Sequence, residues 1–129
     1  MWAASRKGPT VTESGTSRTL TVVVHERENS IVVAATGEID IASVPELQAA
    51  LDALAPGCVP VLDLTGVSFM GSVGLSALVA AAEAAEPHRV RVVSSPQVRR
   101  PIDVTGLDQV VALYETLDDA LADELSPSL

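Results

Sequence analysis

The chain of 129 residues is long enough for one domain, and 47% of its residues are hydrophobic, which suffices for a buried core. Its formal net charge of -9 argues against nucleic acid or an anionic membrane surface as partners, because both require clustered Lys and Arg. The single cysteine, Cys58, excludes an internal disulfide and a cysteine-based zinc site, and we expect a buried free thiol in a reducing cytoplasm.

Two stretches bear on targeting. Residues 1–17 are polar and rich in turn-forming residues, and they lack the apolar run of a secretory signal, so they are predicted to form a disordered leader. Residues 64–82 carry no charge and approach the length of a membrane span, but three glycines interrupt them and no Trp or Tyr marks an interface. We therefore expect a cytoplasmic protein that makes no use of a membrane.

The first elements in chain order are two strands. Residues 19–25 and 30–36 are rich in β-branched side chains, and the charged, turn-forming residues 26–29 separate them. This pattern predicts an antiparallel hairpin, with Gly37 ending the second strand.

A helix is predicted after the hairpin. Ser43 and Glu46 have the S-x-x-E spacing of a capping box, and Leu47, Leu51 and Leu54 lie on one helical face. A Pro-Gly pair then ends the helix.

The centre of the chain is an apolar run at 59–64, followed almost at once by an amphipathic helix. The run predicts a short strand buried on both faces, in which Asp63 is expected to be a hydrogen-bonded structural residue. Ser72 is expected to cap the following helix. The stripe expected to face the core consists of Leu75, Leu78, Val79 and Ala82.

Two more strands and two more helices complete the pattern. A strand at 89–93 precedes a helix that should be short, kinked or ended near Arg100, because Pro101 removes a backbone hydrogen bond. A fifth strand is expected at 110–114, and Thr116 starts a last acidic helix. The order ββαβαβαβα predicts an α/β fold with a mixed central sheet and helices packed on it.

Three motifs in this order resemble one family. They are TGEID at 36–40, the segment from VLDL at 61–64 through VSFM to Ser72, and VTGL at 104–107. Together they resemble the STAS domain of bacterial anti-sigma factor antagonists. The resemblance implies a STAS-like fold for residues 18–125, followed by a C-terminal tail at 126–129.

The resemblance also implies a function. Members of this family are non-enzymatic binding modules that need no cofactor or metal. They bind an anti-sigma factor that is also a serine kinase, and phosphorylation of a serine at a helix start dismisses the antagonist. A phosphatase is a further candidate partner, and the chain is expected to be a monomer or a weak homodimer.

Carried over to this chain, Ser72 falls on the phosphoacceptor, and Asp40 falls on an acidic loop residue that lies near it in the family. A phosphoserine carries about -1.5 to -2 charges, which disrupts an interface that holds carboxylates or apolar groups. On the helix that begins at Ser72, we expect one flank to share the side of Ser72 and we expect Ala77 and Ala84 to point outward. The surface that these positions form carries almost no charge, which favours docking of a protein. The predicted partner-binding residues are Asp40, Gly71, Ser72, Val73, Ser76, Ala80 and Glu83.

Two positions depart from the family pattern. Gly71 stands where an Asp usually precedes the phosphoacceptor, and Val73 stands where Ser or Thr often follows. The missing carboxylate leaves a second hypothesis open, in which the chain is a non-switching STAS subunit, either a stressosome-like scaffold or an adaptor in a transport system. Under that hypothesis Ser72 is only a helix cap and Asp40 only a turn residue.

Enzymatic functions fit the sequence less well. The nucleophile elbow G-x-S-x-G would need glycine where Met70 stands, and no histidine follows a suitable Asp. A receiver domain would need a late lysine, but the only lysine is Lys7. His25 and His88 are expected to be exposed and to form no metal site. One basic cluster remains as a possible contact for an acidic partner, formed by Arg89, Arg91, Arg99 and Arg100.

Overall fold

The computed structural model describes residues 12–16, 20–27, 30–55 and 57–122. Within them one six-stranded sheet has its strands side by side in chain order. Three strands form its antiparallel part: β1 (Thr12–Thr16), β2 (Leu20–Arg27) and β3 (Ser30–Ile39). Parallel to β3 follow β4 (Val61–Met70), β5 (Arg91–Ser94) and β6 (Ala112–Tyr114). The predicted mixed α/β sheet is confirmed.

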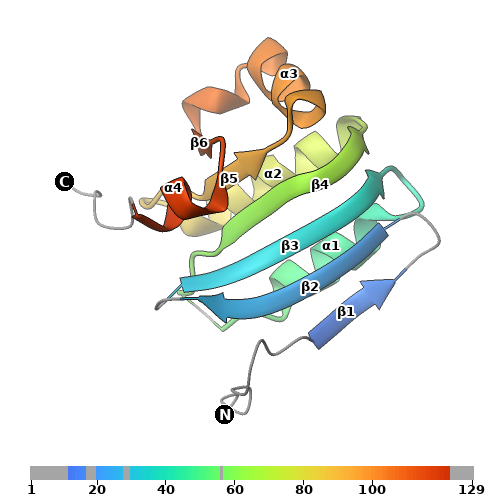
Figure 1. Ribbon diagram of the computed structural model, residues 1–129, viewed down its shortest axis with the longest axis vertical. Helices are drawn as coiled ribbons and strands as arrows, with labels where there is room; N and C mark the ends of the chain where they lie inside the picture. Colours follow the sequence, from blue (N-terminus) through green and yellow to red (C-terminus); the bar gives the residue numbers. More distant parts are fainter. Residues whose placement is uncertain (1–11, 17–19, 28–29, 56, 123–129) are drawn as a thin grey trace.

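Helices cover the two faces of the sheet unequally. In Figure 1, α1 and α2 lie behind the sheet, α3 lies beyond β5, and α4 lies in front of the sheet at its left end. The helical segments are α1 (Val44–Asp52), α2 (Ser72–Ala85), α3 (Pro96–Thr105), the 3-10 helix η2 (Leu107–Gln109) and α4 (Leu117–Ala122). None of these helices is long and apolar enough to cross a bilayer.

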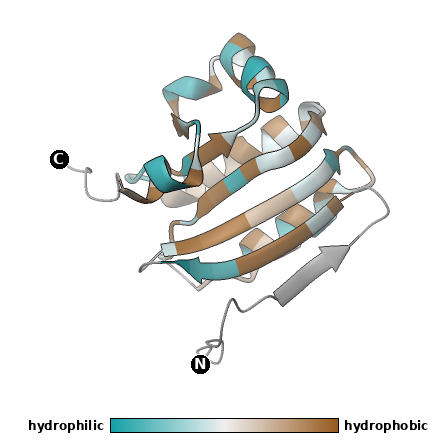
Figure 2. Cartoon of the chain, viewed as in Figure 1, coloured by the Kyte–Doolittle hydropathy of each residue, from teal (hydrophilic) through white to brown (hydrophobic). Residues whose placement is uncertain are grey.

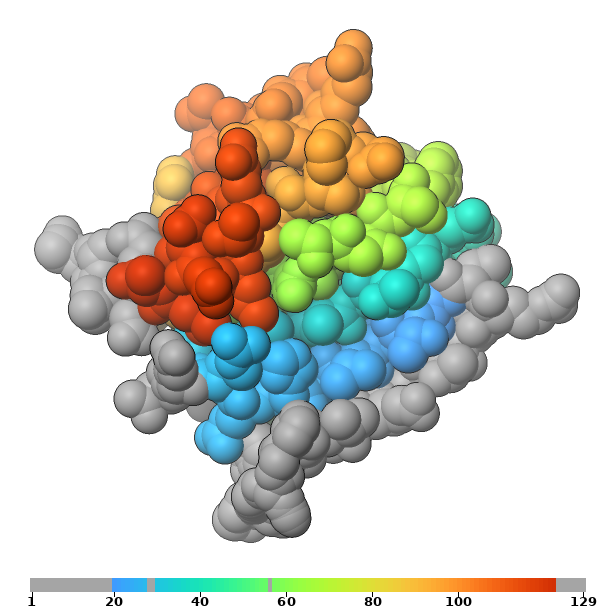
Figure 3. All heavy atoms as spheres, viewed as in Figure 1, coloured from blue at the N-terminus to red at the C-terminus, as the bar shows by residue number. Residues whose placement is uncertain are grey.

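Alternating side chains of the strands build two cores of different size. Val33, Leu62 and Val92 face the large core beneath α1, α2 and α3. Val32, Val61 and Val93, each adjacent to one of them in sequence, face the small core beneath α4. Because neighbouring side chains on both faces are apolar, the central strands are coloured as hydrophobic over long stretches in Figure 2. Figure 3 shows that α4 covers only one end of the front face, next to side chains of β3 and β4.

The structure differs from the prediction at the N-terminus. Residues 12–16 form β1, which pairs antiparallel with β2, so the prediction of a disordered leader over residues 1–17 is wrong for these five residues. The remainder of that leader and the predicted tail at 126–129 lie outside the described residues.

Two strands run further than predicted because their glycines do not end them. β3 continues through Gly37, which has φ 119 at an irregularity in the pairing with β4, and β4 continues through Gly66 to Met70. A Cβ atom at Gly66 would lie 2.9 Å from Thr36 Oγ1, so glycine here permits close approach of the two strands. Asp63 is confirmed as a structural residue, because its Oδ1 accepts hydrogen bonds from the N–H and the hydroxyl of Thr65.

Of the alternatives predicted for the third helix, an end near Arg100 is wrong. α3 continues through Pro101 to Thr105 and ends at Gly106, which has φ 81. The hydrogen bond that Pro101 cannot make would reach the carbonyl of Gln97, which is an exposed residue, so the loss of this donor leaves no buried polar group unsatisfied.

Candidate functional site

Ser72 lies where the carboxyl ends of β3 and β4 meet the start of α2. The N–H of Gly71 donates to the carbonyl oxygen of Ile39 over 2.9 Å, which joins the residue before Ser72 to the residue before Asp40. The side chain of Ser72 is exposed, and Asp40 is half-buried. The two principal site residues predicted from the sequence are therefore brought to the same edge of the sheet.

Ser72 is the first residue of α2, and the prediction that it caps this helix is wrong. The cap is Gly71, whose carbonyl oxygen accepts the N–H groups of Gly74 over 2.9 Å and Leu75 over 3.3 Å. The hydroxyl of Ser72 is therefore not used for capping. It lies at the positive end of the helix dipole, where an anionic group is stabilised.

Gly74 sets how closely α2 approaches the strand ends. A Cβ atom at this position would lie 2.4 Å from Met70 Cγ and 2.9 Å from Ile39 Cγ2, both shorter than a tolerated contact. Ile39 and Met70 are themselves buried. The first turn of α2, and with it Ser72, is thus held directly against the ends of β3 and β4.

Asp40 organises the loop that leads from β3 into α1. Its Oδ1 accepts the N–H of Ala42 over 3.0 Å and the N–H of Ser43 over 2.9 Å. In return, the buried Ser43 hydroxyl accepts the N–H of Asp40 over 2.9 Å and donates to the carbonyl of Glu38 over 2.7 Å. The predicted capping box of Ser43 and Glu46 is therefore not formed, because the Ser43 hydroxyl fixes this loop instead.

The exposed face of α2 is not centred where the sequence suggested. Ala77 is buried, so the prediction that it points outward is wrong, and Val73 is half-buried. Leu75 and Val79 were predicted to face the core, but they are only half-buried. The side of the helix that packs against the sheet is a different one, and small residues on it allow close approach. The exposed residues of α2 are Ser72, Ser76, Ala80, Glu83 and Ala84. This face carries a single charge.

Two apolar residues beside Ser72 were missed by the sequence interpretation. Ile41, directly after Asp40, is 78% exposed, and Phe69, three residues before Ser72, is 52% exposed. Apolar residues are expected in the core, so composition gives no signal for them. Alternation gives no signal either, because the pairing of β3 with β4 is irregular here: Gly37 lies opposite Val67 and Glu38 lies opposite Phe69, and Val67 is buried whereas Phe69 is exposed.

The region around the site is acidic. Residues 28–88, which include β3, α1, β4 and α2, contain eight Asp and Glu residues and no Lys or Arg. This segment therefore carries most of the net charge of the chain, with Glu38 and Asp40 near the strand end beside Ser72 and Glu83 and Glu86 at the far end of α2.

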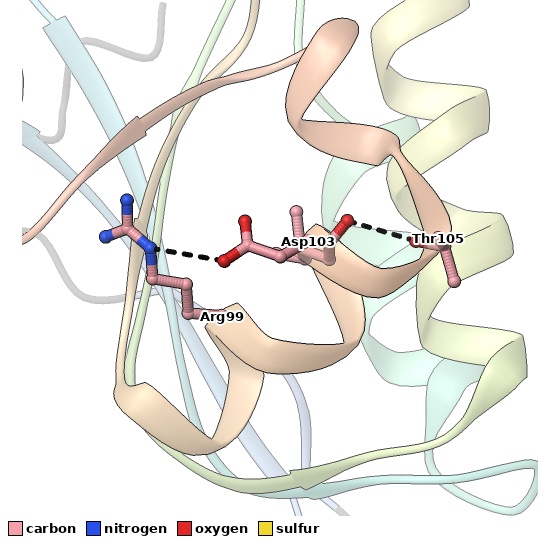
Figure 4. A network of polar contacts seen from close by, with 4 residues as sticks. Arg99, Asp103 and Thr105 are labelled. Atoms are coloured by element: carbon pink, nitrogen blue, oxygen red, sulfur yellow. Dashed lines mark hydrogen bonds and ion pairs between the residues drawn. The ribbon is translucent and has the colours of Figure 1, made fainter.

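The four arginines of the predicted basic cluster do not act as one surface. Arg89 donates to the carbonyl of Gln109, and Arg91 donates to the carbonyl of Ala120, so both tie β5 and the residues before it to later segments. On α3, Arg99 forms an ion pair with Asp103 at 3.8 Å, close to the Thr105 hydroxyl that closes the last turn (Figure 4).

An open groove of about 340 Å³ lies at the other end of α2, between this helix and η2. Val79 and Ala82 contribute apolar lining from α2, Leu107 and Val110 contribute it from the opposite side, and Glu83 lies at its edge. Since a helix rises about 1.5 Å per residue, Glu83 is about 16 Å along α2 from Ser72.

Other reactive side chains lie apart from the site. His25 is half-buried, contrary to prediction, and its pKa is lowered by desolvation and by the charge of Arg27, while Asp63 acts in the opposite direction. Cys58 is half-buried rather than buried, and desolvation raises the pKa of its thiol. The part of the chain that the structure describes holds no group of three His, Cys, Asp or Glu residues arranged for a metal ion.

Comparison with known proteins agrees with this arrangement. The sequence pattern of the STAS domain matches residues 21–120. The chain belongs to the STAS domain family. The match runs from β2 through β6 and ends within α4, so the STAS domain accounts for nearly everything that the structure describes.

Relatives of this STAS domain include named regulators. The anti-sigma-F factor antagonist RsfB of Mycobacterium tuberculosis is 37% identical over 106 residues, which cover 79% of this chain and 87% of the relative. The crystal structure of an anti-sigma factor antagonist from Mycobacterium paratuberculosis superposes with a TM-score of 0.74 at 39% identity, covering 84% of this chain and 96% of that one. A protein of Shewanella loihica with a SpoIIAA-like fold has a TM-score of 0.50 at 14% identity, covering 86% and 98%, and is similar in fold alone.

Proposed function

We propose that this STAS domain is an anti-sigma factor antagonist, a non-enzymatic cytoplasmic module that binds an anti-sigma factor of the serine-kinase type and is released when Ser72 is phosphorylated. The observation that carries the proposal is the exposed hydroxyl of Ser72 at the first position of α2, within a surface that is nearly uncharged. The names of the relatives supply the class of partner.

The proposed binding surface joins two elements. One is the outward face of α2, with Ser72, Ser76, Ala80 and Glu83, and the other is the loop that Asp40 organises. Both are rigid, because hydrogen bonds fix the loop and Gly74 packs α2 onto the strand ends. A rigid surface loses little conformational entropy when a partner binds.

Phosphorylation acts on this surface in two opposite ways. Within the domain, the positive end of the α2 dipole stabilises the phosphate, so the fold is retained. Within the complex, the phosphate would have to be desolvated against uncharged groups, with the acidic Asp40 nearby. A kinase that has just transferred a phosphate also still holds the negative diphosphate of its nucleotide. We therefore expect dissociation without unfolding, and a phosphatase would restore binding.

The test compares wild type with Ser72→Asp in capture from an extract of the source organism, with partners identified by mass spectrometry. We expect an anti-sigma factor with a kinase domain to bind wild type and to be lost with Ser72→Asp. The matched control is Ala122→Asp, which adds the same charge at an exposed position of α4, on the opposite face of the sheet, and should leave binding unchanged.

A second assay tests the covalent step. The captured anti-sigma factor, purified and supplied with ATP, should place one phosphate on wild type and none on Ser72→Ala. Equal capture by wild type and Ser72→Asp, with no phosphate on Ser72, would instead support a constitutive scaffold or adaptor. The glycine at position 71, in place of an acidic residue, is the feature that favours this second candidate.

A further inference from the structure

We propose that Ile41 and Phe69 are the apolar anchors that insert into the anti-sigma factor, and that Asp40 contributes as the positioning residue of Ile41 rather than as a charged contact. This inference rests on the proposed function, since it identifies which side chains of the proposed surface carry the affinity.

Exposure is the first argument. Ile41 is 78% exposed and Phe69 52% exposed, although the domain buries its other large apolar side chains around them, including Ile39 and Met70. Large apolar side chains at the centre of an interface, once desolvated in a partner's pocket, carry most of the binding free energy.

Location is the second argument. Phe69 is the penultimate residue of β4, the strand that precedes α2, and its ring lies 3.6 Å from the position that a Cβ atom of Gly71 would occupy. Ile41 follows Asp40 on the neighbouring strand end, and the hydrogen bond from Gly71 to Ile39 connects the two segments. The apolar residues are thus continuous with the surface proposed around Ser72.

The loop geometry assigns the role of Asp40. Its Oδ1 already accepts the N–H groups of Ala42 and Ser43, the two residues that directly follow Ile41. These bonds close the turn whose exposed residues are Ile41 and Ala42. An exposed side chain held by a fixed backbone is preorganised for insertion, so less conformational freedom is lost on binding.

Charge specifies the chemistry of the partner. Glu38 lies opposite Phe69 on the adjacent strand and is exposed, and residues 28–88 hold no Lys or Arg. The complementary surface is therefore an apolar pocket with a basic group opposite Glu38, apart from the uncharged part that faces Ser72. A second copy of this chain would bring two acidic surfaces together, which disfavours self-association through this patch.

The experiment measures affinity for the purified anti-sigma factor that wild type captures, by calorimetry at two salt concentrations. We expect Ile41→Ala and Phe69→Ala each to weaken binding at least 10-fold, and wild-type binding to weaken at the higher salt concentration. The control is Val104→Ala, a substitution of an apolar residue on α3 that is 76% exposed, which should change affinity less than 2-fold.

Asp40 is tested by two substitutions. Asp40→Asn retains an oxygen that accepts both N–H groups and should stay within about 3-fold of wild type, whereas Asp40→Ala should lose about as much affinity as Ile41→Ala. The double variant Asp40→Ala with Ile41→Ala should lose less than the sum of the two effects, because both act through Ile41. Thermal unfolding of each variant verifies that it is folded before its affinity is compared.

Each unfavourable result has a distinct meaning. If Ile41→Ala and Phe69→Ala behave like Val104→Ala while Ser72→Asp still abolishes binding, the anchors are refuted and the proposed function stands. If Asp40→Asn is as damaging as Asp40→Ala, Asp40 acts through its charge and the positioning role is refuted. If wild type forms a dimer that Ile41→Ala dissociates, the patch serves self-association and the inference fails. If Ser72→Asp binds like wild type, the proposed switch fails independently of the anchors.

Discussion

Replacing Gly74 by Ala tests whether close packing at the start of α2 is as tight as the geometry indicates. The added methyl group would lie 2.4 Å from Met70 Cγ and 2.9 Å from Ile39 Cγ2. Neither atom is at the free end of a flexible chain, because Ile39 is branched at Cβ and Met70 must move near its base. Overpacking of this kind costs about 1–3 kcal/mol. Alanine recovers about 1 kcal/mol of helix propensity relative to glycine.

With the packing cost in the upper part of its range, the two effects leave a net loss of about 1–2 kcal/mol in the free energy of unfolding. Urea denaturation measures this loss, and an m-value of about 1–3 kcal/mol per M converts it into a midpoint lower by roughly 0.3–2 M. The control Ser76→Ala, exposed on the same helix, makes no such contact and should be neutral or slightly stabilising. A Gly74→Ala variant at least as stable as wild type would refute the packing argument.

Three further predictions concern the same end of the molecule and the sheet. Ser43→Ala leaves two main-chain groups of the loop without their buried partner, and we expect a loss of about 1–3 kcal/mol in the free energy of unfolding, measured by urea denaturation. Because desolvation lowers the pKa of His25 below its unfolded value, the unfolded state binds more protons. Stability should therefore fall as the pH drops from about 6.5 through the folded-state pKa, and His25→Gln should flatten this part of the profile. Gly71→Asp fits sterically, and it supplies a better helix cap and a carboxylate beside Ser72. If the carboxylate promotes phosphorylation of Ser72, a kinase assay should show a faster rate for this variant. An unchanged rate would contradict that role.

The sequence predicted the alternation of strands and helices because periodicity is local. Strands of β-branched residues and helices with apolar stripes are visible in any window of ten residues. The errors have more than one cause, and one of them is a residue that serves a contact distant in sequence. Gly66 suggests a strand end, but it is a glycine because Thr36 of the neighbouring strand lies so close. Pro101 suggests a helix end, but its missing hydrogen bond falls on the exposed side.

The candidate site was predictable in part for the same reason. Ser72 and Asp40 came from motifs that resemble a family, and the structure places both at one edge of the sheet. The bond between Gly71 and Ile39 that joins them spans more than thirty positions and leaves no local pattern. The exposure of Phe69 was equally hidden, because hydrophobicity alone predicts burial.

The agreement between strand order and chain order has a consequence for how the molecule forms. Each strand from β2 onward pairs with a strand that has already been synthesised, so the sheet can grow from its N-terminal edge while the ribosome is still at work. The small core cannot form while the chain is still being synthesised, because Val32 and Val61 pack with Leu121, which belongs to the last helix. Closing that long loop makes α4 the final element to dock. A chain truncated before α4 should then retain the sheet and α2 but expose the valines of β3 and β4 to aggregation.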